Sequence, residues 1–362
     1  MAHTRSVNTY FPQSNVDQNI RFNRRHFLRA ALVVGTAASV GFGLPQVLRA
    51  AAPSSRRPSR RPIPVILDTD IGDDIDDTWA LGFLLNSPEL ELKLAVGDYG
   101  KNQYRAKLLA KFLQTVGRSD VAVGIGLDLE PHGVGGQAAW VKDYDLKSYP
   151  GRVHTDGVQA MIDAIMQAKG PVTVIAIGPL PNVAAALERE PRIARRARFV
   201  GMYGSVRIGY NGSPTAAAEW NVKANPQACQ KVFTAPWEMT ITPLDTCGLV
   251  TLDGDRYRRI RDAQSPVAAA IIENYRLWSK SQDPKNDVAE KRSSVLFDTV
   301  GVYLALSQKL CRMEKLGIRV TNEGMTVIDN QAKRISAATG WNTLDGFRDL
   351  LVSRLQGPAL TR

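Results

Sequence analysis

The chain has 362 residues, 44% of them hydrophobic, and a formal net charge of +11, and this length is sufficient for one large α/β domain or two small ones. Residues 1–61 contain ten arginines, no lysine and a single acid, Asp17, so this segment carries +9 and the rest of the chain only +2. The basic balance therefore gives no support for nucleic-acid binding by the main part of the chain.

The first segment contains an arginine pair ahead of an apolar stretch. Arg24-Arg25 precede an Ala/Gly/Val-rich run over 30–44, and 50–52 are alanines suited to cleavage. This order is typical of a twin-arginine export signal, whereas a membrane anchor is disfavoured because the run is short, glycine-containing and ends at Pro45. We expect a signal peptide over 1–52, a disordered linker over 53–62 and a folded domain over 63–362. The protein is expected to be exported to the periplasm or cell exterior, without membrane contact unless the signal stays uncleaved.

Apolar β-type runs then alternate with helical patterns. Strands are predicted over 65–67, 92–96, 121–125, 172–177, 199–203 and 239–244, and helices over 77–86, 104–116, 156–168 and 182–187. Short strands that are apolar on both sides and separated by helices predict an α/β fold, a single large domain with a mostly parallel central sheet flanked by helices. Cys229, Cys247 and Cys311 form no disulfide framework and no metal-binding spacing, so buried thiols are expected.

Six aspartates follow the first predicted strand within ten positions: Asp68, Asp70, Asp73, Asp74, Asp76 and Asp77. Carboxylates this close raise one another's pKa and destabilise the fold unless a cation offsets them. Ca²⁺ and Mg²⁺ prefer oxygen ligands, and ligands of open α/β sheets bind at the carboxyl ends of strands. Helix capping by Asp76 or Asp77 is the alternative, but it accounts for only one or two of the six. The cluster therefore predicts a divalent-cation site.

The aspartate spacing also bears on two other kinds of site. An EF-hand loop fits poorly, because the spacing lacks Gly at its sixth position and Glu at its twelfth. Asp68-Thr69-Asp70 fits a Mg²⁺-dependent haloacid-dehalogenase-type phosphatase with Asp68 as nucleophile. That chemistry has no use for Asp76-Asp77, but a phosphatase stays open as an alternative.

The stretch "DTDIGDDIDDTWAL" resembles the N-terminal signature of the inosine/uridine-preferring nucleoside hydrolase family, with a turn after Gly72 that is two residues longer. Asp76-Asp77 match its final acidic pair, and Asp74 is an alternative match. The segments 172–206, 211–229 and 293–306 and the stretch from Gly324 are similar, in order, to later motifs of the family. The resemblance covers about residues 64–355 and implies a Ca²⁺-dependent hydrolase of the N-glycosidic bond of ribonucleosides.

The resemblance also implies roles for the matching positions. The Ca²⁺ ligands would be Asp70, Asp77, Asp298 and the main-chain carbonyl of Ile177, and Asp70 would be the base for a metal-bound water. The substrate would be held by Asp76, Asp98, Asn211, Glu219 and Asn221, together with Asp298. Carboxylates and amides around the sugar suit an oxocarbenium-like transition state.

The leaving base is contacted in many family members by a His that precedes the later Asp, and here that position is Phe297. An aromatic residue there resembles purine-preferring members, in which stacking replaces the acid, although Phe297 fits a plain core residue equally well. Trp140 is a weaker candidate for a second stacking wall, and His132 and His154 fall in expected loops. A small-molecule riboside substrate, no nucleic-acid partner and a homodimer or homotetramer are expected. The non-enzymatic alternative is an exported Ca²⁺- or sugar-binding protein.

Overall fold

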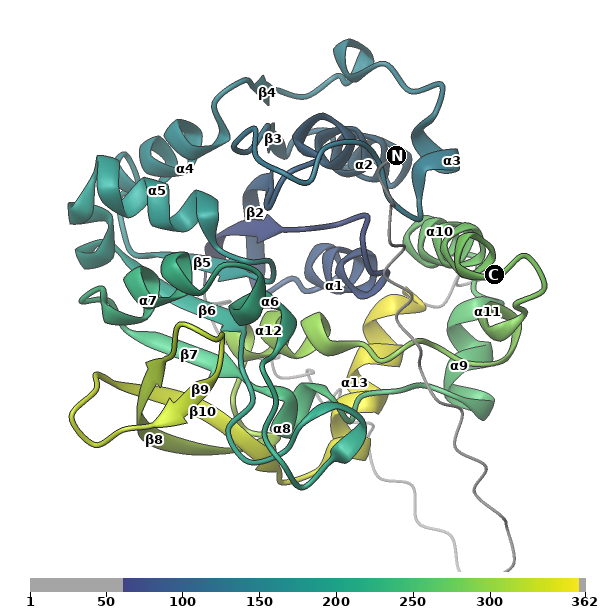
Figure 1. Ribbon diagram of the computed structural model, residues 1–362. Helices are drawn as coiled ribbons and strands as arrows, with labels where there is room; N and C mark the ends of the chain where they lie inside the picture. Colours follow the sequence, from purple (N-terminus) through teal and green to yellow (C-terminus); the bar gives the residue numbers. More distant parts are fainter. Residues whose placement is uncertain (1–60, 358–362) are drawn as a thin grey trace, which may run out of the picture. The chain divides into compact units, whose positions relative to one another are not determined.

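The computed structural model describes residues 61–357 (Figure 1). The predicted signal peptide and all of the predicted linker except residues 61 and 62 lie outside the described residues. Within 61–357, no helix is long and apolar enough to cross a membrane.

One ten-stranded sheet forms the centre of the domain, in the order β4-β3-β2-β1-β5-β6-β7-β10-β8-β9. The first eight strands in this order, β4 to β10, are parallel to their neighbours, whereas β8 is antiparallel to both β10 and β9. The strands are β1 (Ile63–Thr69), β2 (Leu90–Gly97), β3 (Ala122–Gly124), β4 (Val153–His154), β5 (Val172–Ala176), β6 (Ala197–Met202), β7 (Met239–Thr242), β8 (Cys311–Val320), β9 (Thr326–Ile328) and β10 (Arg334–Trp341).

Helices connect most of these strands. They are α1 (Asp76–Leu85), α2 (Asn102–Thr115), α3 (Ala138–Val141), α4 (Gly157–Met166), α5 (Pro181–Arg189), α6 (Trp220–Ala224), α7 (Pro226–Thr234), α8 (Leu244–Cys247), α9 (Gly254–Arg261), α10 (Pro266–Gln282), α11 (Val288–Lys291), α12 (Phe297–Leu306) and α13 (Leu344–Leu355). Short 3₁₀ turns are η1 (Leu146–Ser148), η2 (Pro191–Arg195) and η3 (Tyr210–Gly212).

Two hydrophobic cores cover the two faces of the sheet. One contains Trp79, Phe83 and Tyr303 and packs α1, α2, α10, α12 and α13 together, and the other contains Phe199 and Trp237 and packs α4, α5 and α7 (Figure 1). Burial on both faces explains why β1 and β5 are apolar runs, whereas β2 alternates with exposed Glu91 and Lys93 over its first half. The predicted fold class is confirmed.

Strand β1 lies at the point where the strand order reverses. The chain runs outward from β1 to β4 on one side and from β5 to β7 on the other, so β1 pairs in parallel with both β2 and β5. Crevices form at such a switch point, outside the carboxyl ends of the strands. The aspartates that follow β1 therefore occupy the position where this class of sheet binds ligands.

Candidate active site

The aspartate turn joins the end of β1 at Thr69 to the start of α1 at Asp76. Gly72 adopts φ +109°, and a Cβ there would lie 2.5 Å from the ring of Tyr104, so this turn requires glycine. The N-terminus of α1 has no side-chain cap hydrogen bond. Helix capping, the alternative use of Asp76 and Asp77, is therefore not what these side chains do.

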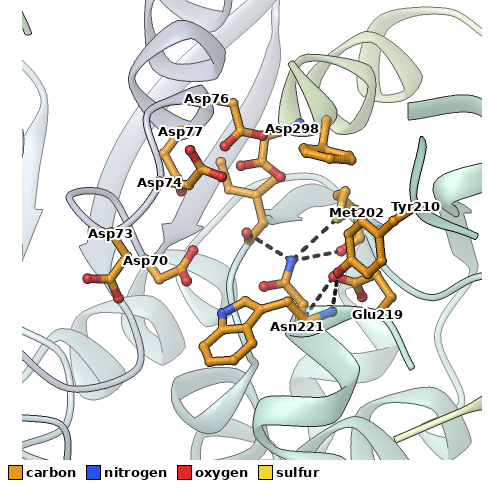
Figure 2. Close-up of a pocket in the computed structure, with 13 residues that line it drawn as sticks. Asp70, Asp73, Asp74, Asp76, Asp77, Met202, Tyr210, Glu219, Asn221 and Asp298 are labelled. Carbon is orange, nitrogen blue, oxygen red and sulfur yellow. Dashed lines mark hydrogen bonds between the residues drawn. The ribbon is translucent and has the colours of Figure 1, made fainter. Parts of the chain in front are cut away.

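One pocket collects the acidic side chains of the turn and residues from three other parts of the sheet. Figure 2 shows the aspartates of the turn and Asp298 along one side, and Tyr210, Glu219 and Asn221 along the other. The lining residues are Asp70, Asp73, Asp74, Asp76, Asp77, Ile177, Met202, Tyr210, Glu219, Trp220, Asn221, Phe297 and Asp298.

Asp76, Asp77 and Asp298 form the tightest group in the pocket. One carboxylate oxygen from each lies within 4.8 Å of the others, and all three side chains are buried. The backbone N–H of Asp298 donates to Asp76 Oδ2 at 3.1 Å, and the Thr69 hydroxyl donates to Asp77. Burial and then repulsion by neighbouring carboxylates, Asp70 and Asp74 among them, raise the pKa of each carboxyl well above its ordinary value. This oxygen-rich, charge-repelling group fits a hard divalent cation.

Asp70 lies beside this group and is 6% exposed. Burial raises the pKa of its carboxyl to about 7, although the nearby Arg105 guanidinium opposes the shift. A carboxylate whose pKa lies near neutrality can accept a proton during a reaction.

The opposite side of the pocket is built where α6 begins. The carboxylate of Glu219 accepts backbone N–H groups from Gly204 at 2.9 Å and Asn221 at 2.7 Å, which fixes its direction. The side-chain amide of Asn221 donates to the carbonyls of Ile177 at 3.2 Å and Met202 at 3.1 Å. The structure thus brings Glu219, Asn221 and the Ile177 carbonyl together with the aspartates, as predicted, and burial raises the pKa of Glu219 to about 7.

Aromatic residues complete the pocket. Phe297 lines it, as the stacking hypothesis requires, and meets Tyr210 edge-on with ring centroids 6.2 Å apart. Tyr210 and Trp220 are 36% and 51% exposed at the pocket, and sequence reasoning missed both. Trp220 stands between the predicted Glu219 and Asn221, so its position in the sequence could have suggested it.

Several predicted residues lie outside the pocket lining. Asp98 is 1% exposed and accepts the backbone N–H of Asn182, so its side chain is turned into the protein. Asn211 is exposed in the turn η3 and is not a lining residue. Trp140 is not a second wall, because it packs against Phe112 in the core. The exposed His132 pairs with Asp128 and Glu130, and neither it nor His154, in β4, lines the pocket.

Asp68 is also directed away from the pocket. Its side chain is fully buried and accepts a hydrogen bond from the Asn182 side chain at 3.0 Å. A nucleophile must reach its substrate. The phosphatase alternative, which depended on Asp68, is therefore not supported by this geometry.

Arg105, on α2, is a further residue that the sequence analysis missed. Its side chain is fully buried behind the aspartate turn and pairs with Asp73 at 2.8 Å, as does Lys101. The guanidinium also donates to four backbone carbonyls, those of Asp70, Ile71, Tyr99 and Gly100. This one side chain therefore ties the turn after β1 to the turn after β2.

Known proteins match most of the chain. It is 27% identical to a pyrimidine-specific ribonucleoside hydrolase, RihA, of Enterobacter sp. (strain 638), over 81% of this chain and 97% of that protein. It is 33% identical to a non-specific ribonucleoside hydrolase, RihC, of Klebsiella pneumoniae (strain 342), over 60% of this chain and 74% of that protein. A purine-preferring ribonucleoside hydrolase from Gardnerella vaginalis has a similar fold, with TM-score 0.66 and 24% identity over 81% of this chain and 98% of that one.

The protein is an N-glycosyl hydrolase of the ribonucleoside hydrolase class. The family profile described as inosine-uridine preferring nucleoside hydrolase matches residues 65–347, and the chain belongs to that family. The enzymatic hypothesis is therefore confirmed, and the non-catalytic alternative is wrong.

Proposed function

We propose that the enzyme is a Ca²⁺-dependent hydrolase of the N-glycosidic bond of ribonucleosides, with a preference for purines, and that it acts after export. The observation that carries this proposal is that the Asp76, Asp77 and Asp298 group shares one pocket with Asp70 and Glu219. Together these residues supply a cation site, a base and hydrogen-bond acceptors for a sugar.

The cation is proposed to be held by Asp70, Asp77, Asp298 and the main-chain carbonyl of Ile177, with Asp76 close enough to contribute. Ca²⁺ is favoured because it accepts six to eight oxygen ligands in loose geometry, which suits several carboxylates on one turn. When bound, the ion would neutralise the repelling carboxylates and lower the pKa of a coordinated water.

Asp70 is the residue proposed to take the proton from the attacking water. Glu219, Asn221 and Asp76 are proposed to accept or donate hydrogen bonds to the ribose hydroxyls, since all three line the pocket. The C1′–N bond weakens ahead of water addition, so positive charge develops on the sugar in the transition state. Fixed carboxylates around the sugar stabilise that charge more strongly than they stabilise the ground state.

A purine preference is proposed from the aromatic side chains. Phe297, Tyr210 and Trp220 present three rings to one pocket. A two-ring base offers more area for stacking than a one-ring base, and an aromatic contact contributes about 0.5–1.5 kcal/mol beyond area burial. The relatives named above include pyrimidine-specific, non-specific and purine-preferring enzymes, so base preference varies among them.

The test is ribose release by a protein that begins at about residue 62, incubated with inosine, adenosine, guanosine, uridine and cytidine. We expect release with Ca²⁺, loss of release with chelator, and faster release from the three purines. Asp70→Ala should lower kcat by more than about tenfold, or 1.4 kcal/mol, with a smaller change in KM. Release from none of the five nucleosides would refute the proposal, and equal rates would remove the purine preference.

Export and assembly are proposed from the sequence and the family resemblance. We propose that residues 1–52 direct export by the twin-arginine route, so the full chain should reach the periplasm and a variant with both Arg24 and Arg25 changed to Lys should stay in the cytoplasm. We further propose a homodimer or homotetramer, for which light scattering of the purified enzyme is the test. A monomeric mass would contradict it.

A further inference from the structure

The turn after β1 contributes two acids to the pocket that the proposed ligand set does not use, Asp73 and Asp74, and they are not equivalent. Asp73 is paired with Lys101 and Arg105, whose charges lower the pKa of its carboxyl. Asp74 lines the pocket and accepts a backbone N–H from Ile75 at 2.7 Å, without a cationic partner among the described residues. The negative charge of Asp74 is therefore not neutralised by a protein side chain and can interact with a ligand bound in the pocket.

The whole lining is negative. Among the described residues, no lysine, arginine or histidine lines the pocket, whereas Asp70, Asp73, Asp74, Asp76, Asp77, Glu219 and Asp298 do. A bound divalent cation would neutralise two of these carboxylates and Asp73 is already paired, so the remaining acids would still leave the pocket with a net negative charge. The rings of Phe297, Tyr210 and Trp220 add a second preference of the same sign, because aromatic faces attract cations. Two independent features of the pocket thus favour a positively charged ligand.

The departing base needs a proton unless it is already positive, and no histidine, lysine or arginine among the described residues lines the pocket to supply one. Both oxygens of Glu219 already accept backbone N–H groups, so although burial raises the pKa of its carboxyl to about 7, a proton on either oxygen would have to compete with one of these donors. The hydroxyl of Tyr210 accepts the backbone N–H of Trp220 at 2.8 Å, and burial raises the pKa of this phenol well above its ordinary value. Phe297 has no proton to give.

We propose that the preferred substrates are ribosides whose base carries a fixed positive charge, such as an N-alkylated purinium or pyridinium riboside. This inference rests on the proposed function and names its substrate class. The C1′–N bond breaks and its electron pair neutralises the base, which leaves without protonation. The water oxygen bonds to C1′ and its proton passes to Asp70, so each turnover yields ribose, neutral base and one proton.

The experiment compares 7-methylguanosine with guanosine, which share one purine ring system and differ in fixed charge. We expect kcat/KM for 7-methylguanosine to exceed that for guanosine by at least about a hundredfold, the contribution ordinarily made by a general acid. The ratio in Asp74→Asn should fall about fivefold, as expected for loss of one charge in a partly solvated pocket. Because the intrinsic lability of the quaternised bond is the same for both proteins, the change in ratio isolates the pocket charge.

The matched control is Asp143→Asn, which removes a side chain that is 88% exposed and is not a lining residue, and it should keep the wild-type ratio. The inference would be overturned if the ratio of kcat/KM for 7-methylguanosine to that for guanosine were near one, or if Asp74→Asn left this ratio unchanged. Turnover of guanosine would in that case still support the proposed function. Turnover of neither riboside would overturn both.

Discussion

Removal of the buried Arg105 guanidinium should both destabilise the enzyme and slow it. Arg105→Met keeps the length and apolar stem of the side chain but deletes the charge and every donor. Asp73 would keep only Lys101 as a partner, and four carbonyls would lose a donor. Breaking a buried ion pair from one side costs about 3–5 kcal/mol, and each carbonyl left unpaired adds about 1–3 kcal/mol unless water reaches it.

We therefore expect Arg105→Met to lower the free energy of unfolding by about 4 kcal/mol or more, measured by urea unfolding in Ca²⁺. Because Arg105 holds the carbonyl of Asp70, kcat should fall about a hundredfold, as a misplacement near 1 Å commonly does. If Arg105→Met does not fold, Arg105→Lys is the variant to measure, because it keeps the charge but not the planar set of donors. It should fold and have a kcat below that of the wild type.

The matched control for this prediction is Arg118→Met, on the chain segment just beyond α2. Arg118 pairs with Asp120 with the two side chains 32% and 64% exposed, so its loss should cost less than about 1 kcal/mol. An Arg105→Met protein within 1 kcal/mol of wild type, with unchanged kcat, would refute the view that this side chain positions the aspartate turn.

Three further outcomes are expected. Asp298→Asn should weaken Ca²⁺ binding at least about tenfold by calorimetry, and unchanged affinity would remove Asp298 from the ligand set. Burial raises the pKa of Asp70 and Glu219 to about 7, so the folded protein without metal binds more protons than the unfolded chain between about pH 4 and 7. Its free energy of unfolding in urea should therefore fall as the pH rises through this range. Addition of Ca²⁺ should reduce that pH dependence. Phe297→His should raise kcat/KM for uridine relative to 7-methylguanosine, and an unchanged ratio would show that a histidine there donates no proton.

The parallel part of the fold was predictable because each strand and helix carries its own pattern. All six predicted strands and four predicted helices are present, with ends displaced by two residues at most. The antiparallel strands were harder, since β10 pairs with β7 on one side and with β8 on the other. The pairing of β10 with β7 joins segments far apart in the sequence, and no strand was predicted over β8, β9 or β10.

Site residues were predicted where they stand in short sequence motifs, and they were missed where their position depends on tertiary packing. Asp76-Asp77 and Glu219 stand in recognisable motifs, and the pocket contains them. Asp98 stands directly after β2, but its carboxyl accepts the Asn182 N–H instead of facing the pocket. Arg105 gave no signal, because its partners lie in two separate turns, and the carbonyls of Tyr99 and Gly100 stand in left-handed backbone over residues 99–101, with φ of +56°, +69° and +45°.

The pairing of Asp76 with Asp298 also bears on how the chain acquires its ion. These residues are 222 positions apart and meet only where α1 packs against α12. Closing so long a loop is an entropic barrier that is overcome only when most of the domain has condensed. A nascent or C-terminally truncated chain would lack the last ligand, so stable ion uptake would mark the completed fold. Binding of the proposed Ca²⁺ ion would then distinguish completely folded molecules from folding intermediates.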